Sequence, residues 1–321
     1  MHSVFLALLA VLAAVSASNR FPSATPDDAW ALLPRENPQL PAWSRVLVKP
    51  LPRTTGAMLE QDRLHRAENP LGPALAAKLR WLAADAIGCE YARATAAGDF
   101  RRAGATKDQL ERLTHGAAEP DERALFAFAR QVTKAAYTVT DGQFAGLLKQ
   151  LGPEKMTAVV ETLAYANFQN RIIMALGIRV EAGGDCPPVD VRLDSRRRAS
   201  VPTPVRPRWV EALAAKPAKR YDAPADWKEV SFAELEERLA AQKERSPRIP
   251  VPDASRFGGL PPDLKRQTDA IVWTKVTAGY QPVMTQSWFA GLREFQQEAR
   301  LDPVFGRTLF WVVTRANDCF Y

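Results

Sequence analysis

Apolar residues recur every three or four positions between Leu71 and Gly177, the spacing that gathers them on one face of a helix. Leu75, Leu79 and Leu82 begin this pattern, and Pro73 suits the first position of a helix because its missing N–H is not needed there. The stretch shows no strand pattern, so we expect an all-α domain over residues 71–180. The pattern predicts helices from 73, over 89–103, from 106, over 121–136, over 140–151 and over 153–176.

The same helical spacing returns after Pro262. It predicts two amphipathic helices, over 264–277 and 285–299, and a third that Asp302 caps and Pro303 begins. This third helix runs towards Cys319, and we read residues 263–321 as the start of a second, incomplete helical domain.

The segments around these domains are rich in proline. Residues 18–70 read as an extended Pro/Trp-rich arm with one short helix at Pro26–Leu33, and residues 181–262 as a Pro/Arg-rich linker. One short helix is predicted in the linker over Ser231–Lys243. The arginines from Arg192 to Arg208 suit either a solvated linker or contact with a polyanion.

The first residues form an apolar run, Val4–Val15, followed by Ser16 and Ala17, which suits a secretory leader over residues 1–17. Such a leader implies export to the periplasm or the extracellular space. The alternative is a cytoplasmic protein with a buried N-terminal helix, since no Lys or Arg precedes the run. Beyond this run no segment is long and apolar enough to predict a membrane span.

Composition narrows the chemistry. The net charge of +7 is too diffuse to require nucleic acid. Three cysteines exclude a disulfide scaffold and a Cys-rich zinc site, and three histidines leave little for metal chemistry or a Ser-His-Asp triad, so we expect no metal and no cofactor. His65 and His115 are expected to be solvated.

The chain contains an internal repeat. Leu71–Tyr91 aligns without gaps on Leu301–Tyr321 with seven of 21 positions identical, which indicates a duplication. The identical pairs are Leu71/Leu301, Pro73/Pro303, Leu79/Leu309, Trp81/Trp311, Ala86/Ala316, Cys89/Cys319 and Tyr91/Tyr321. The first copy continues to Ile178, so we expect either that the sequence is a fragment or that the last helix packs on the first domain or another subunit.

Cys89 and Cys319 are both predicted at the turn into a following helix. A helix N-terminus favours thiolate, so either cysteine could have a lowered pKa, and the alternative for Cys89 is a small buried apolar side chain. A redox pair needs a second thiol one helical turn later, and Ala92 stands there in the first copy.

The order of these elements resembles the carboxymuconolactone decarboxylase / alkylhydroperoxidase D-like superfamily. The resemblance covers Leu71–Ile178 fully and Thr285–Tyr321 in part. It rests on the segments Gly88–Tyr91, Arg101–Thr106, Asp121–Ala129, Tyr165–Arg171 and Arg315–Tyr321. It implies a small all-α domain that forms homo-oligomers, and in the redox members a Glu-x11-Cys-x2-Cys-x3-His motif that reduces hydroperoxides.

Carried over residue by residue, the motif fits poorly. In the first copy Cys89 matches the resolving cysteine, while Ala77, Ala92 and Ala96 stand at the Glu, attacking Cys and His positions. In the second copy Arg307 stands at the Glu position and Cys319 matches the resolving cysteine. The resemblance therefore implies a degenerate first copy and an active dithiol in the incomplete second one.

Three functions follow as hypotheses. The first is a thiol-dependent hydroperoxide reductase with Cys319 and Cys89 as candidate site residues, a peroxide as substrate and a thiol reductant as partner. The others are a cofactor-free decarboxylase-type lyase and a non-catalytic helical scaffold. Asn167 with Arg171, and Glu161 with Tyr165, are expected to form structural hydrogen-bond pairs rather than substrate contacts.

Overall fold

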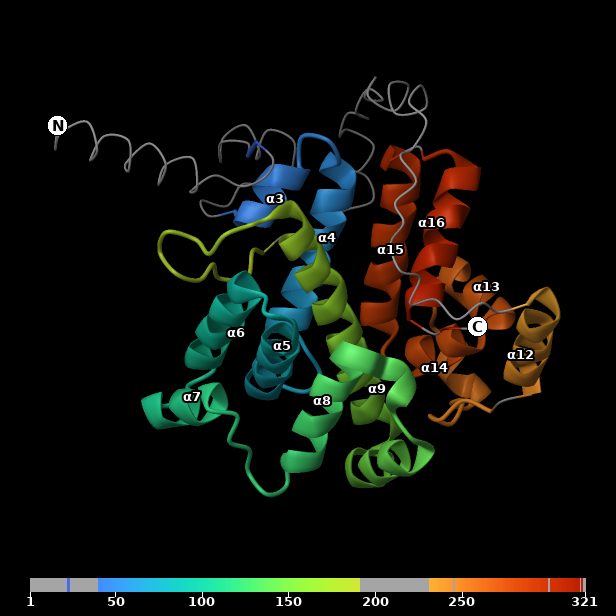
Figure 1. The fold of residues 1–321 in the computed structure, drawn as a ribbon, viewed down its shortest axis with the longest axis horizontal. Coiled ribbons are helices and arrows are strands. Elements are labelled where there is room, and N and C mark those ends of the chain that lie inside the picture. The colour runs from blue at the N-terminus through green and yellow to red at the C-terminus, as the bar shows by residue number, and fades with distance from the viewer. Residues whose placement is uncertain are drawn as a thin grey trace, which may run out of the picture.

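The computed structural model describes residues 22–23, 40–190, 231–244, 246–299, 301–317 and 319. Within these residues the structure is helical, with one isolated β-bridge between Glu181 and Gly184 and no strand, which confirms the all-α prediction for this part of the chain. The N-terminal helices are α3 (Ala42–Leu47), α4 (Pro52–Ala67), α5 (Pro73–Ile87), α6 (Glu90–Arg102), α7 (Lys107–Thr114), α8 (Arg123–Ala135) and α9 (Asp141–Leu176). The C-terminal helices are α12 (Phe232–Glu244), α13 (Pro262–Ala270), α14 (Val272–Tyr280), α15 (Pro282–Ala299) and α16 (Pro303–Ala316), as Figure 1 shows.

Several predictions concern residues outside this description. They are the leader over 1–17, the short helix at Pro26–Leu33 and the arginines from Arg192 to Arg208. No helix in the described part of the chain combines the length and the apolar character that crossing a bilayer requires.

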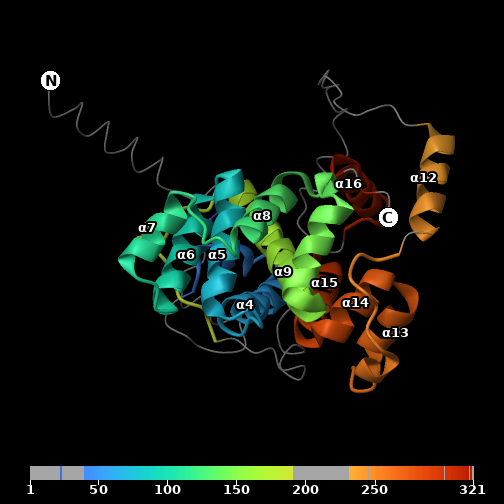
Figure 2. The same cartoon turned by 90° about the horizontal axis from the view of Figure 1, so that it is seen from below.

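Helix α5 forms the centre of the N-terminal unit. Helices α6, α8 and α9 pack around it (Figures 1 and 2), and its side chains Leu79 and Leu82 are fully buried. The apolar stripe predicted from sequence therefore faces a core, to which α8 contributes Phe128 and α9 contributes Met156 and Leu163. Burial of each such side chain stabilises the fold by roughly 1.5–3 kcal/mol.

The predicted ends of several helices are confirmed. Thr106 caps α7 in a capping box with Gln109, and Gly177 ends α9 in the left-handed conformation. The helices predicted over 140–151 and 153–176 form one element, α9, which bends at Gly152 (φ 75°) before Pro153.

The prediction of an extended arm over residues 18–70 is wrong for its described part. Residues 42–67 form helices α3 and α4, and Trp43 is only 2% exposed. The prolines suggested an extended chain. However, Pro41 and Pro52 stand where helices begin, and proline is tolerated there. Around Trp43 lies a second apolar cluster. It contains Met58 of α4, Ile173 of α9, and Cys89, which lies between α5 and α6.

The linker prediction for residues 181–262 also needs correction. Residues 181–190 pack back onto the first unit, where Cys186 and Val189 are buried, and Ile249 joins the central core. The predicted short helix exists as α12. The single helix predicted over 264–277 is two helices, α13 and α14, because the backbone is extended at Ile271 (φ −133°, ψ 119°).

The duplication reaches further upstream than the aligned 21 residues. Helices α4 and α5 have counterparts 230 positions later in α15 and α16, so that Pro52 pairs with Pro282 as the first residue of its helix. Helix α14 similarly lies at the positions that correspond to α3. Six more identical pairs share this offset: Trp43/Trp273, Val46/Val276, Pro52/Pro282, Thr55/Thr285, Arg63/Arg293 and Glu68/Glu298.

Matched hydrogen bonds support this alignment. Thr55 Oγ1 donates to the carbonyl of Leu51 at 2.7 Å, and Thr285 Oγ1 lies 2.9 Å from the carbonyl of Gln281. At the other end of the repeat, the N–H of Cys89 bonds the carbonyl of Ala84 and the N–H of Cys319 bonds the carbonyl of Thr314, each at 2.9 Å. We call Ala42–Ile178 the first copy and Val272–Tyr321 the second copy, which aligns with residues Ala42–Tyr91 of the first.

The two copies meet through α4 and α15, which run antiparallel. At one end Arg53 donates to Glu294 and Gln297, and its backbone N–H donates to Glu298. In the middle the equivalent residues Gln61 and Gly291 approach each other, since a Cβ placed on Gly291 would lie 3.9 Å from Oε1 of Gln61. Antiparallel helices that meet at equivalent residues are related by a local twofold axis.

Candidate functional site

The turn between α5 and α6 carries Cys89. Gly88 closes α5 with a left-handed backbone (φ 72°) that glycine adopts without a steric penalty, and Cys89 is the N-cap residue of α6. The predicted position at a helix N-terminus is therefore confirmed. The side chain points inward: Cys89 is 2% exposed, and its Sγ donates to the carbonyl of Asn170 on α9 at 3.9 Å.

Burial decides the ionisation of this thiol. It raises the pKa of Cys89 above the ordinary value, although backbone and Arg93 contributions act in the opposite direction. The lowered pKa expected from the helix N-terminus is therefore wrong for Cys89, since loss of hydration outweighs the helix dipole. Cys89 is a protonated, buried thiol in the apolar cluster that also contains Met58 and Tyr91.

The positions that the resemblance would give to catalytic groups are apolar and closed in the first copy. Ala77 is 1%, Ala92 is 7% and Ala96 is 0% exposed. An alanine side chain can neither accept nor donate a proton, and all three of these side chains are buried.

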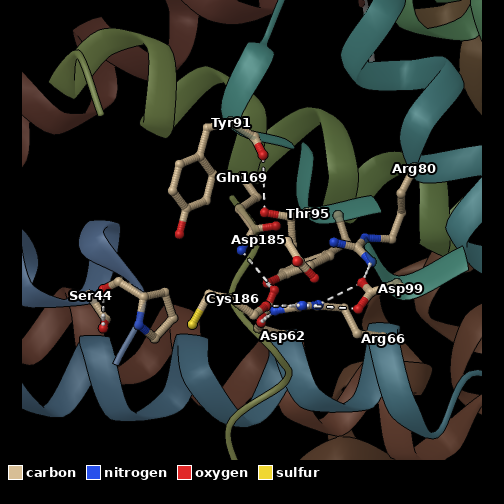
Figure 3. A network of polar contacts seen from close by, with 12 residues as sticks. Ser44, Asp62, Arg66, Arg80, Tyr91, Thr95, Asp99, Gln169, Asp185 and Cys186 are labelled. Atoms are coloured by element: carbon tan, nitrogen blue, oxygen red, sulfur yellow. Dashed lines mark hydrogen bonds and ion pairs between the residues drawn. The ribbon is translucent and has the colours of Figure 1, made fainter. Parts of the chain in front are cut away.

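A buried network of charged residues lies nearby, between α4, α5 and α6 (Figure 3). At its centre Asp99 of α6 accepts from Nε and Nη2 of Arg66, at 2.8 and 3.0 Å, and from Arg80 of α5. Arg102, one turn later on α6, donates to the same carboxylate at 2.6 Å. These guanidinium groups hold the pKa of Asp99 well below its usual value although burial acts to raise it.

Asp62 is the second acid of the network. Its Oδ2 accepts from Arg66 at 2.9 Å, and its Oδ1 accepts from Tyr165 at 3.1 Å and Gln169 at 2.8 Å, both on α9. All four carboxylate oxygens of Asp62 and Asp99 thus have donors. Buried charges with complete partners of this kind specify how helices pack, whereas a general base needs a free lone pair.

His65 lies beside this network and corrects a sequence prediction. It is 2% exposed rather than solvated, and its ring stacks on Tyr165 with centroids 4.2 Å apart. Burial, with the charge of Arg80 adding to it, lowers the pKa of His65 to about 3, so the ring is neutral. His115, by contrast, is exposed at the end of α7, as predicted.

The segment after α9 closes the network. The backbone carbonyl of Cys186 accepts from Arg66, and Glu181 accepts from the Tyr91 hydroxyl at 3.0 Å. Asp185 pairs with Arg102 and lies against Gly98, where an added Cβ would clash with the Asp185 carboxylate. Burial raises the pKa of Cys186 to about 11, so this thiol is also protonated.

The structure contains one of the two polar pairs predicted on α9. Asn167 and Arg171 do bond each other, at 3.0 Å, and both reach Thr133 of α8. Glu161 and Tyr165 form no such pair: Tyr165 faces Asp62, and Glu161 faces Thr285 of the second copy at 2.9 Å.

The described part of the second copy does not repeat this network. At the positions of Asp62, His65 and Arg80 it carries Leu292, Phe295 and Phe310. Cys319 follows α16 as Cys89 follows α5, but Cys319 is exposed. Arg307, at the position of the motif Glu, lies on α16, of which no residue is buried.

The sequence prediction missed Asp62, Arg66, Arg80, Asp99, Asp185 and Cys186 as a cluster. The one local signal was the spacing of Asp62 and Arg66, four residues apart on a helix. Cys89 is linked to this cluster by Tyr91, which shares its apolar surroundings and donates to Glu181. Cys319 belongs to the other copy. The described residues contain no group of three His, Cys, Asp or Glu side chains placed to hold a metal ion.

Comparisons of the chain with models of protein families, with curated proteins and with solved structures gave no match. The resemblance to the alkylhydroperoxidase D-like superfamily therefore stays a prediction from the motifs.

Proposed function

We propose that the protein is a thiol-dependent hydroperoxide reductase of the alkylhydroperoxidase D-like kind, in which the second copy carries the redox thiol and the first copy is its structural partner. One observation supports this division. Two equivalent cysteines occupy equivalent turns, yet Cys89 is sealed in an apolar cluster and Cys319 is open to solvent.

The first chemical step needs an accessible thiolate. The Cys319 sulfur attacks one oxygen of the peroxide, so that an S–O bond forms as the O–O bond breaks, and the second oxygen leaves as an alcohol or water once it takes a proton. The product is a sulfenic acid on Cys319. Sulfur is oxidised by two electrons and the peroxide is reduced by two.

The second step needs a second thiol. That thiol attacks the sulfenic sulfur, a disulfide forms and water leaves; a further thiol then reduces the disulfide. Cys89 and Cys186 are buried and protonated, so they do not take this part. In the motif the cysteine three positions after Cys319 attacks the peroxide, and Cys319 has the resolving position. Here we assign the attack to Cys319 because it is exposed, and a small-molecule thiol reductant takes the second step.

The test is thiol-dependent peroxide consumption by the full chain with hydrogen peroxide and an organic hydroperoxide. We expect Cys319→Ser to lower the rate at least about tenfold, the size of one lost catalytic interaction, and Cys89→Ser to leave it within about twofold. Trapping the sulfenic acid on Cys319 with a dione reagent would identify the intermediate. A Cys319 reaction no faster than that of free cysteine would contradict the proposal.

The second candidate is a non-catalytic helical scaffold. The observation that favours it is the saturated network of the first copy, in which Asp62 and Asp99 have no free oxygen and three alanines replace the motif residues. This candidate predicts equal and slow peroxide consumption in the wild type and in Cys319→Ser.

A further inference from the structure

Glu161 is a half-buried acid at the contact between α9 and the second copy. Its Oε1 lies 2.9 Å from Thr285 Oγ1 on α15, and its Oε2 is closed off from solvent with no hydrogen-bond partner among the described residues. One and two turns from this contact, Phe168 and Trp288 meet edge to face with ring centroids 5.4 Å apart. Helices α9 and α15 lie side by side in Figures 1 and 2.

The hydroxyl of Thr285 has two neighbours and one proton. It lies 2.9 Å from the carboxyl of Glu161 and 2.9 Å from the backbone carbonyl of Gln281. A carbonyl oxygen can only accept, and in the first copy the equivalent Thr55 gives its proton to the equivalent carbonyl. If Thr285 does the same, the carboxyl of Glu161 must donate to Thr285 Oγ1, which requires that Glu161 carry a proton.

The surroundings of Glu161 favour the neutral form. Helix α4 carries Arg53, Glu60, Asp62, Arg63, His65 and Arg66, helix α14 carries Lys275 and Tyr280, and helix α15 carries Arg293, Glu294 and Glu298. Arg53 is paired with Glu294 and Glu298, and Asp62 with Arg66, so none of these forms an ion pair with Glu161. Burial raises the pKa of Glu161 to about 8, although a Thr285 hydroxyl that donates to the ionised carboxylate would oppose that rise.

We propose that Glu161 is a proton-controlled contact between the two copies: its protonated carboxyl holds α15 against α9, and its ionised form releases that contact. An ionised carboxylate there would have one oxygen sealed from water without a donor, which is costly in a buried site. The equivalent threonine of the first copy, Thr55, has no such acid beside it. Among the described residues, a proton-controlled contact of this kind therefore occurs only between α9 and α15.

The direction of the pH effect follows from linkage. When α15 is detached, Glu161 is exposed and loses its proton near its ordinary value of 4.5, whereas in contact it keeps the proton up to about pH 8. Below the lower value both states are protonated and the contact is strongest. Between the two values detachment releases a proton, so raising the pH favours detachment by about tenfold per pH unit.

Hydrogen exchange of the full chain tests this proposal. After correction for the chemical exchange rate, the opening equilibrium of the α14 and α15 amides should rise with pH between about pH 5 and 8 in the wild type. Glu161→Gln should abolish the rise, because an amide donates the same hydrogen bond without ionising. Glu154→Gln, which changes an exposed carboxylate on the same helix, is the matched control and should keep the wild-type slope.

A second measurement follows the carboxyl group itself. Carbon NMR of the side-chain carboxyls should show one glutamic acid that titrates near pH 8 and disappears from the spectrum of Glu161→Gln. Equal slopes in the wild type and Glu161→Gln, or a Glu161 carboxyl already ionised at pH 6, would overturn the proposal.

Discussion

The two copies show what one local sequence pattern does in two environments. In both, a proline begins the helix, a Leu and a Trp follow at the same positions, and a cysteine N–H closes the helix with the same backbone bond. In the first copy Leu79 and Trp81 are 0% and 5% exposed, and in the second Leu309 and Trp311 are 44% and 50% exposed. Local sequence therefore sets the helix and its end, while the helices packed on it decide burial, ionisation and reactivity.

We expect the largest loss of folding free energy from a mutation in the charged network of the first copy. Arg66→Ala leaves Asp62 and Asp99 buried without their shared partner, which should cost roughly 3–5 kcal/mol of folding free energy. The equivalent change in the second copy, Gln296→Ala, removes an exposed side chain and should cost less than about 0.5 kcal/mol. Chemical denaturation of both variants measures the difference. Equal losses would mean that the network does not stabilise the first copy.

We expect the next largest difference in stability from the equivalent leucines Leu79 and Leu309. Leu79→Ala opens a cavity in the central core and should destabilise the protein by about 2–5 kcal/mol. Leu309→Ala truncates a side chain that is already half exposed and should stay within about 1 kcal/mol. Thermal unfolding of the pair tests this, and a large loss in Leu309→Ala would show that in solution another surface covers α16.

We expect the smallest losses of stability from mutations at the residues that precede α16 and α5. Asp302 accepts from the N–H groups of Val304 and Phe305, both at 3.0 Å, so Asp302→Ala should destabilise α16 by about 1 kcal/mol. In the first copy Gly72 stands at this position with φ 80° and no side-chain cap. Gly72→Ala should cost a similar amount for another reason, the strain of a side chain at positive φ. Amide exchange at the first turn of each helix separates the two causes.

Much of the fold could be predicted from sequence, because its determinants are local. The stripe of α5, the capping box of Thr106 and the glycine end of α9 follow from spacing and from single residues. The existence of the second copy followed from matched residues. Helix α4 could not be predicted in the same way, because Asp62, His65 and Arg66 look like a solvated surface until α6 and α9 are known to cover them.

The candidate site was harder to predict than the fold. Cys89 was placed correctly at a helix N-terminus, but its ionisation depends on burial by α9 and by residues 181–190, which no local pattern reveals. The acid Glu161 was visible on its helix, and its neighbour Thr285 lies 124 positions away in the chain.

The meeting of Gln61 with Gly291 has an evolutionary consequence. In a dimer of identical subunits, a residue on the symmetry axis must face itself, so every substitution is made twice and must suit both sides. Joining the subunits in one polypeptide removes that constraint. Here Arg53 bonds Glu298 at one end of the contact, while at the other end Glu68 is kept and Val283 stands at the position of Arg53. Within one polypeptide, the two halves of such a contact can therefore carry different side chains.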